Sequence, residues 1–337
     1  MNVLLIGGSG NISTEVARAL AERNHEVMVL SRGNRPVDPK YTHIRASRDD
    51  AGAMAAAIRD SGKEPDVVIN FLGFGVEDCK IDHEVFAGKI RQYIFISTAM
   101  VYSKPHKLPI TEDHPRGNEL SDYATAKIAC EDWLLEQNGD DFPVTIVRPS
   151  HTFGQDWIPS PCSGSNDWTV AARILAGKPV VVPDDGQSLW TLTACSDFAD
   201  ALVGLVGCDE AIGEAFHITH DAALSWNAIY FEIGLALGKQ AEVVAIPTDF
   251  LVQQEPTLEG GLKADKAHHA VFDNTKIKRF VPDWEAKLSF RQAIRKSMDW
   301  YRQGESRQNP DAEKDAAMEA WIEAWQQRKD KGDLSIG

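Results

Sequence analysis

Val3-Leu-Leu-Ile6-Gly7-Gly-Ser-Gly10-Asn-Ile-Ser13 joins an apolar run to a glycine-rich turn near the start of the chain. Four consecutive apolar residues are typical of a strand that is buried on both faces of a parallel sheet. Gly7 permits a tight turn after this strand, and Gly10 lets the backbone approach a pyrophosphate at the N-terminus of the next helix. Ser13 stands where a third glycine would favour close packing of helix and strand. The stretch predicts a strand, a phosphate-binding turn and a helix; the alternative is a turn without a ligand.

The first half of the chain repeats this alternation of strands and helices. Apolar runs predict further strands, and amphipathic spacing predicts the helices between them. The strands are expected at Val3–Ile6, Glu26–Leu30, Thr42–Arg45, Asp66–Phe71, Tyr93–Ser97 and Val144–Arg148, and the helices at about Ser13–Arg23, Asp50–Ser61 and Tyr123–Asn138. This alternation predicts an α/β fold with a Rossmann-type, doubly wound parallel sheet.

Beyond Pro149 the alternation becomes less regular. Residues 150–168 are rich in Pro, Ser, Gly and Trp and are expected to form a loop. Shorter elements follow: helices at Thr169–Ala176, Ser196–Val206 and about 226–237, strands at Pro179–Val182, Phe216–Thr219 and Glu242–Ile246, and a C-terminal helix within Asp311–Lys329. We therefore predict two lobes. Residues 1–152 and about 188–228 would form a dinucleotide-binding domain, and about 153–187 and 229–337 a smaller α/β substrate lobe with the C-terminal helices.

Composition argues against several classes of function. The 337 residues carry a formal net charge of −15, which disfavours a general surface for nucleic acid or an anionic membrane, because both reward clustered Lys and Arg. The five cysteines lack the spacing of a zinc site, so no metal is expected. No signal peptide precedes the first strand, and no apolar run reaches the roughly 18 residues of a membrane span. The sequence thus predicts a soluble, cytoplasmic protein whose partner is a small molecule.

The second strand ends in Ser31-Arg32-Gly33-Asn34-Arg35, where a site that prefers NAD usually carries an Asp or Glu for the ribose hydroxyls. Here a hydroxyl and two guanidinium groups take that place. A guanidinium matches a 2′-phosphate in charge and geometry, so these residues favour NADP over NAD. In the alternative, Arg32 only stacks on the adenine, and the choice of cofactor stays open.

Tyr123 and Lys127 lie four residues apart on a predicted helix and therefore share a face. A free phenol has a pKa of about 10, which is too high for a base at neutral pH. We expect the Lys127 ammonium and an oxidised nicotinamide to lower this pKa, so that Tyr123 exchanges a proton while the nicotinamide exchanges a hydride. Lys127 would also hold the nicotinamide ribose. Thr98, at the carboxyl end of the Tyr93–Ser97 strand, would hydrogen-bond the reacting oxygen, and Ser97 is the competing hydroxyl donor.

Several motifs together resemble the extended short-chain dehydrogenase/reductase superfamily, in its NAD-dependent epimerase/dehydratase branch. They run from GGSGNIS at the first turn through INFLG, FISTAMVY and YATAK to VRPSHTFG, and the later stretch from Gly186 to Ala199 has a similar pattern. The resemblance covers nearly the whole chain. It implies that Thr98, Tyr123 and Lys127 are catalytic and that the glycine turn holds the dinucleotide.

The predicted cofactor site combines the first turn with the ends of the neighbouring strands. Its residues are Gly7, Gly10, Asn11, Ile12, Ser31, Arg32, Arg35, Leu72, Gly73, Lys127 and Pro149. Substrate contacts are expected from Ser150, His151 and Trp190. For His151, a local hydrogen-bonding role is the alternative to catalysis. For Trp157, Trp168 and Trp190, packing is the alternative to stacking on a sugar or base.

The chain also departs from the family pattern. Trp190 stands near the position where nucleotide-sugar epimerases and dehydratases usually carry an Arg that holds the substrate diphosphate. Ala99 and Met100 follow Thr98 in place of the Asp-Glu pair of the 4,6-dehydratases, so no acid/base pair for water elimination is evident. Segment 70–93 is too short for the long helix that helps the family to dimerise. These departures resemble the sub-branch that includes the chloroplast stem-loop RNA-binding proteins.

Three hypotheses about function follow. The leading one is an NAD(P)-dependent epimerase or oxidoreductase acting on a secondary alcohol or ketone of a sugar or nucleotide-sugar. One alternative is a dissociable NADPH-dependent reductase of a small carbonyl compound, which Arg32 and the missing diphosphate Arg favour. The other is a non-catalytic cofactor-sensing or RNA-binding protein on the same fold, against which the net charge of −15 and the complete Thr/Tyr/Lys set argue. The resemblance also makes a homodimer an expectation.

Overall fold

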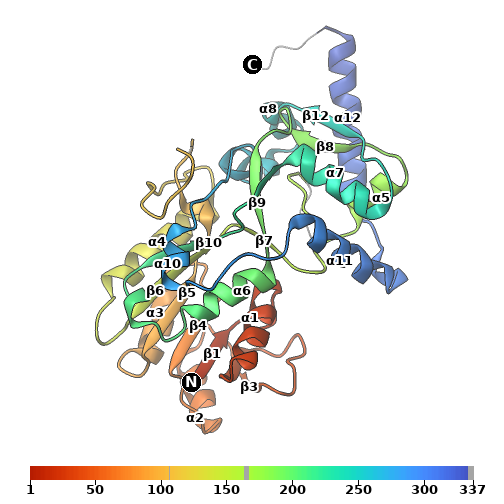
Figure 1. The fold of residues 1–337 in the computed structure, drawn as a ribbon. Coiled ribbons are helices and arrows are strands. Elements are labelled where there is room, and N and C mark those ends of the chain that lie inside the picture. The colour runs from red at the N-terminus through yellow and green to blue at the C-terminus, as the bar shows by residue number, and fades with distance from the viewer. Residues whose placement is uncertain (106, 163–166, 333–337) are drawn as a thin grey trace.

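The computed structural model describes residues 1–105, 107–162 and 167–332, and its largest element is a sheet of seven strands (Figure 1). The strands are β1 (Asn2–Ile6), β2 (Glu26–Ser31), β3 (Thr42–Arg45), β4 (Val67–Asn70), β5 (Gln92–Ile96), β6 (Val144–Pro149) and β10 (Ala215–Ile218). Their order is β10-β6-β5-β4-β1-β2-β3, and every neighbouring pair is parallel. The prediction of a Rossmann-type, doubly wound parallel sheet is confirmed.

Helices bury both faces of this sheet. α1 (Asn11–Glu22) and α6 (Cys195–Gly204) cover one face, and α2 (Ala51–Asp60), α3 (Val76–Phe86) and α4 (Asp122–Glu136) cover the other. Alternate residues of β1 show why its apolar run is continuous. Val3 and Leu5 pack in the cluster that contains α1 and α6, whereas Leu4 and Ile6 pack in the cluster that contains the other three helices.

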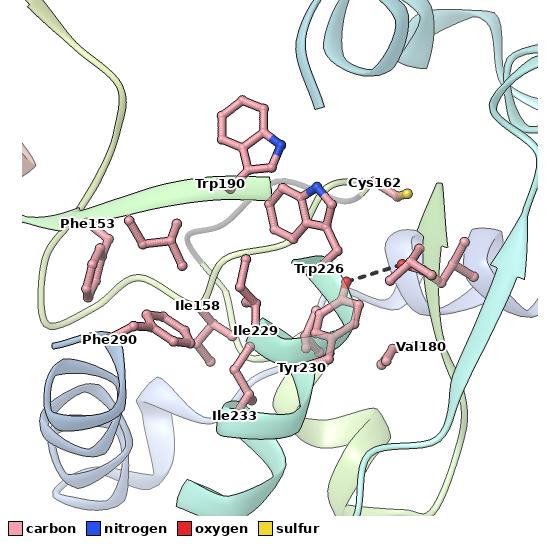
Figure 2. Packing of buried hydrophobic residues seen from close by; sticks show 14 of the residues in the cluster. Phe153, Ile158, Cys162, Val180, Trp190, Trp226, Ile229, Tyr230, Ile233 and Phe290 are labelled. Carbon is pink, nitrogen blue, oxygen red and sulfur yellow. Dashed lines mark hydrogen bonds between the residues drawn. The ribbon is translucent and has the colours of Figure 1, made fainter. Parts of the chain in front are cut away.

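A smaller lobe follows the parallel sheet. It contains a three-stranded sheet of β7 (His151–Phe153), β9 (Leu189–Ala194) and β11 (Ala223–Ser225), and a pair formed by β8 (Val180–Pro183) and β12 (Val243–Ile246). The remaining helices are α5 (Thr169–Leu175), α7 (Trp226–Leu237), α8 (Thr248–Gln254), α9 (Glu259–Gly261), α10 (Thr275–Phe280), α11 (Phe290–Arg302) and α12 (Ala312–Asp330). Figure 2 shows part of the apolar core of this lobe, where side chains of α7 pack beneath Trp190.

The C-terminal helix docks on this core. Met318, Trp321 and Trp325 of α12 are buried in it, as their helical spacing predicts. Among the helices within the described ranges, none combines the length and the apolar character that crossing a membrane requires.

The prediction of a loop over residues 150–168 is wrong for three residues. Residues His151–Phe153 form β7, which pairs with Leu192–Ala194 of β9, and β9 and β11 were not predicted. Such short strands exist because distant segments meet, so no local pattern marks them. Residues 163–166 of the predicted loop lie outside the described part of the chain. The boundaries between the two predicted domains stay a prediction.

Candidate active site

The glycine turn after β1 is fastened by the side chain of Ser13. Its hydroxyl donates a hydrogen bond to the Gly7 carbonyl (2.8 Å) and accepts one from the Gly10 N–H (2.8 Å). Gly7 has a φ of +88°, and a Cβ there would lie 2.5 Å from Leu72 Cγ, so only glycine suits this position. Gly10 is the N-cap of α1, whose first N–H groups are available to an anion. The sequence predicted only that a small residue is needed at Ser13; it did not predict these two hydrogen bonds of the hydroxyl.

Two cavities adjoin at this turn. The first has a volume of about 850 Å³ and contains the predicted reaction centre, and the second has about 540 Å³ and contains the end of β2. Gly7, Gly10 and Leu72 line both cavities. This arrangement would suit a dinucleotide. Its pyrophosphate would lie at the N-terminus of the helix, and its two nucleoside halves would enter the two cavities.

The structure brings most of the predicted site residues to these cavities. The first is lined by Gly7, Gly10, Asn11, Ile12, Leu72, Thr98, Tyr123, Pro149, Ser150, His151 and Trp190, and the second by Ser31, Arg32 and Arg35 together with the three shared residues. Gly73 and Lys127 line neither cavity. A Cβ at Gly73 would lie 2.5 Å from the Phe95 ring, so this glycine permits close packing of the loop after β4.

Lys127 lies behind the first cavity rather than in its wall. The side chain is buried, and its Nζ donates hydrogen bonds to the carbonyls of Gly73 (2.7 Å) and Ile96 (2.8 Å). Burial lowers the pKa of Lys127 to about 8, against weaker opposing effects of Cys130 and Cys79. In this arrangement Lys127 joins the loop after β4 to the end of β5. A contact with a nicotinamide ribose stays a prediction.

Thr98 and Tyr123 meet at the mouth of the first cavity. Thr98 follows β5, and Tyr123 is the second residue of α4, which is capped by Ser121. Partial burial raises the pKa of Tyr123, and a hydrogen bond with the Thr98 hydroxyl offsets part of this rise. The predicted lowering of this pKa by Lys127 is not found, because Lys127 Nζ lies 5.8 Å from the centre of the phenol ring and bonds to backbone carbonyls instead.

Ser97, the competing hydroxyl donor, also lines the first cavity. Its Oγ is buried and has no hydrogen-bond partner within the described ranges. The Thr98 hydroxyl accepts a hydrogen bond from the Met100 N–H (3.2 Å), and it keeps the pKa of the Tyr123 phenol lower than burial alone would. Thr98 is therefore favoured over Ser97 as the hydroxyl that acts with the phenol.

The wall of the second cavity contains Arg48 in addition to Arg32 and Arg35, together with the carboxylates of Asp49 and Asp78. Arg35 donates to the Ser9 carbonyl (3.2 Å), and Arg32 lines the wall beside it. Arg45 was missed: a Cβ at Gly33 would lie 3.0 Å from its Nε, so its guanidinium lies directly beside the turn after β2. Arg45 is brought there by the parallel register of β3 with β2, which pairs it with Ser31. No signal in the sequence gives this register.

The far end of the first cavity was also missed. A short π-helix, Leu262–Lys266, contributes Asp265 and Lys266 to the wall. Lys266 Nζ donates to the Asp265 carboxylate and lies 4.3 Å from the centre of the Trp190 ring. The Lys266 carbonyl accepts hydrogen bonds from the indole N–H groups of Trp190 (3.2 Å) and Trp226 (3.1 Å). Only the tertiary fold brings this segment to the cavity.

Comparison with known proteins now decides the family. The sequence model of the NAD dependent epimerase/dehydratase family matches residues 3–87 and 83–218, which together span more than half of the chain. The chain belongs to this family. The resemblance drawn from its motifs is thereby confirmed, and the protein is an enzyme of the NAD dependent epimerase/dehydratase family.

Curated relatives in this family have different activities. A 2'-dehydrokanamycin reductase of Streptomyces kanamyceticus is 27% identical over 292 residues, which cover 85% of this chain and 81% of the reductase. The chloroplast stem-loop binding protein of 41 kDa b of Arabidopsis thaliana is 25% identical and matches 67% of this chain and 61% of that protein. A UDP-glucose 4-epimerase of Lactobacillus helveticus is 30% identical and matches 44% of this chain and 51% of the epimerase. The name of the family therefore does not decide the reaction.

Solved structures show the same fold. The UDP-glucose 4-epimerase of Thermotoga maritima, solved with UDP-glucose, superposes with a TM-score of 0.72 at 19% identity and covers 90% of this chain and 99% of its own. The UDP-glucose 4-epimerase of Bifidobacterium longum, in complex with NAD+ and UDP, has a TM-score of 0.70 at 18% identity, with coverage of 90% and 99%. At this identity the likeness concerns the fold.

Replacing His151 with Gln is expected to make the enzyme less sensitive to acid. Burial, with a smaller contribution from Lys266, lowers the pKa of His151 to about 3, whereas the unfolded chain has the ordinary value of about 6.5. Between these values only the unfolded chain binds the proton, so the free energy of unfolding falls as the pH drops from about 6.5 toward about 3. The variant should lose about 2 kcal/mol less than the parent between about pH 7 and about pH 5.

Urea unfolding at the two pH values measures this difference. The exposed His269 provides a matched control, because His269→Gln removes a histidine at the surface of the same lobe. Equal pH dependence of parent and His151→Gln would show that His151 is not held neutral.

Proposed function

We propose that this enzyme is an NADP-dependent oxidoreductase that interconverts a secondary alcohol and a ketone on a sugar or sugar-like ring. Tyr123 would exchange the proton, Thr98 would orient the reacting oxygen, and the glycine turn would hold the pyrophosphate. The observation that carries the proposal is that Thr98 and Tyr123 line the same cavity as the glycine turn. A hydroxyl, a phenol and a dinucleotide-binding turn are the parts that hydride exchange at a carbonyl requires.

Tyr123 can supply the proton that the reducing direction requires. When bound, the nicotinamide supplies or accepts the hydride at the substrate carbon. A reduced ketone needs a proton on its oxygen, and a phenol whose pKa is raised above its ordinary value carries that proton at neutral pH. Thr98 can donate a second hydrogen bond to the same oxygen. In the oxidising direction Tyr123 must lose its proton, which the positive charge of an oxidised nicotinamide would favour.

Lys127 supports this centre from behind. Its two hydrogen bonds fix the Gly73 and Ile96 carbonyls, and the second of these immediately precedes Ser97 and Thr98. We infer that Lys127 positions Thr98 through the end of β5, and that its ammonium adds positive potential near the cofactor site.

The choice of NADP rests on the end of β2. Ser31, Arg32 and Arg35 line the second cavity, and the guanidinium of Arg45 lies beside Gly33. The guanidinium groups of Arg32 and Arg35 in this cavity favour a 2′-phosphate, because arginine matches phosphate in charge and in hydrogen-bond geometry. A site for unphosphorylated ribose would be expected to carry a carboxylate at this strand end instead.

The extent of similarity favours a reductase over an epimerase. The 2'-dehydrokanamycin reductase matches 85% of this chain, whereas the Lactobacillus epimerase matches 44%. An epimerase is the second candidate, because several relatives are named as epimerases. The stem-loop binding relative makes RNA binding the third, and the net charge of −15 argues against it. Cytoplasmic location and a homodimer stay predictions.

Mass spectrometry of the nucleotide released by denaturing freshly purified enzyme tests this choice. A reductase that exchanges its cofactor should release much less than one nucleotide per chain, and it should consume NADPH when offered ketosugars. One tightly held NAD(H) per chain would instead indicate an epimerase and would contradict the assignment of NADP.

A further inference from the structure

Two residues in the wall of the first cavity each have a buried nitrogen atom without a hydrogen-bond partner in the described part of the chain. These atoms are His151 Nε2 and Trp157 Nε1. Both residues line the cavity, and their rings contact each other edge to face with a centroid separation of 5.9 Å and an interplanar angle of 78°. A buried polar atom without a partner costs free energy, so two such atoms in one cavity wall indicate a ligand that supplies the missing hydrogen bonds.

His151 lies among three indole rings. The centroids of Trp157, Trp190 and Trp226 are all within 6.1 Å of the imidazole centroid, and Figure 2 shows Trp190 on β9 close to Trp226 at the start of α7. Trp190 and Trp226 already donate to the Lys266 carbonyl, so of these three indoles only Trp157 has an N–H without a partner among the residues that the structure describes. Because burial keeps the imidazole neutral, His151 suits a neutral hydroxyl better than a charged group.

The ionised side chains that line this cavity are already paired. They are Asp265, Lys266 and Lys314. Lys266 donates to Asp265, Lys104 lies 3.6 Å from the same carboxylate, and Lys314 donates to Asp167. Although burial raises the pKa of Asp265, the two lysines outweigh that effect and keep the pKa below its ordinary value. The carboxylate therefore stays ionised, and a phosphate entering the cavity would have to break an existing ion pair.

We propose that the substrate of this site is a polyhydroxylated ring that carries neither phosphate nor nucleotide, held by hydrogen bonds with His151 Nε2 and Trp157 Nε1. The proposal rests on the proposed function and narrows its substrate class. A ring hydroxyl both donates and accepts, so it can satisfy the imidazole nitrogen in either tautomer and accept from the indole N–H. The apolar face of such a ring can pack on the Trp157 indole, which has one apolar body and one polar edge.

Binding to the Tyr123→Phe enzyme saturated with NADP+ tests the substrate class without turnover. The probes are D-glucose, D-glucosamine, methyl glucoside and myo-inositol on one side, and glucose 1-phosphate, UDP-glucose and UDP on the other. We expect at least one phosphate-free ring to raise the thermal midpoint at millimolar concentration, and none of the phosphorylated probes to do so at a lower concentration. Tighter binding of a phosphorylated probe, or no effect of any phosphate-free ring, would overturn the proposal.

Two substitutions in the same enzyme test the two contacts. His151→Leu and Trp157→Phe each remove one hydrogen bond while keeping an apolar side chain, and each should weaken binding of the responding ring about tenfold. His151→Gln should retain most of the affinity, because a neutral amide still forms the bond. Trp168→Phe is the matched control, since Trp168 is buried against Tyr301 outside the cavity wall. Unchanged affinity in Trp157→Phe would overturn the proposal even if His151→Leu did not fold.

Affinity for NADP+ distinguishes this proposal from the proposed function. The substitutions at His151 and Trp157 should change it much less than the affinity for the ring, because Ser31, Arg32 and Arg35 of the second cavity stay in place. If the enzyme binds NADP+ but prefers UDP-glucose, the substrate class is wrong and the chemistry of the site still stands. If it binds no dinucleotide, the proposed function itself fails.

Discussion

The variant Tyr123→Phe is expected to reduce kcat by about 10³-fold while the affinity for NADPH stays the same. The substitution removes only the phenol oxygen, and proton transfer by a positioned side chain contributes about 10²- to 10⁴-fold to a reaction rate. Tyr123 lines the cavity that contains the glycine turn, and Thr98 lines the same cavity. Steady-state oxidation of NADPH by a responding ketone measures kcat, and fluorescence titration measures the affinity.

Tyr41→Phe is the matched control for this variant, because Tyr41 lines neither cavity. It should retain the parental rate. Thr98→Val should fall between the two, since it removes a hydroxyl that lines the same cavity but leaves the proton donor in place. Near-normal turnover of Tyr123→Phe would refute the assigned role of the phenol.

The substitution Arg32→Asp should weaken NADPH binding about 100-fold and leave NADH binding nearly unchanged. A charge-assisted hydrogen bond to phosphate contributes about 1.5–3 kcal/mol, and the new carboxylate adds repulsion toward the 2′-phosphate. The same carboxylate can accept hydrogen bonds from the unphosphorylated ribose of NADH. Arg45→Asp should have a smaller effect in the same direction, because Arg45 approaches the turn from the neighbouring strand.

Arg59→Asp makes an equal change of charge on the exposed surface of α2 and controls for long-range electrostatics. It should alter neither affinity. If Arg32→Asp keeps the parental affinity for NADPH, Arg32 does not bind the 2′-phosphate, and the choice of cofactor must come from other residues.

The parallel sheet could be predicted from local pattern because its inner strands are buried on both faces. Val3–Ile6 is apolar at every position for that reason, and β4 and β5 are apolar apart from Asn70 and Gln92. β7 could not be predicted in this way. It has three residues and exists because it meets β9, about forty residues later in the chain.

The candidate site, like the fold, could be predicted only where the local sequence determines the structure. Spacing along a helix shows that Tyr123 and Lys127 share a face, but it does not give the direction of a flexible side chain, and Lys127 Nζ bonds to two backbone carbonyls. Asp265 and Lys266 reach the cavity through a π-helix that follows no recognisable motif. Residues of the turn were predictable because the chemistry of pyrophosphate binding dictates them locally.

Titration of the unmodified enzyme with NADPH and with NADH, followed by the fluorescence of the reduced nicotinamide, tests the central claim most directly. The two adjoining cavities and the guanidinium groups at the end of β2 predict one saturable NADPH site per chain, with NADH bound at least about tenfold more weakly. Absence of saturable binding by either nucleotide would contradict the account of this site as a centre for hydride transfer.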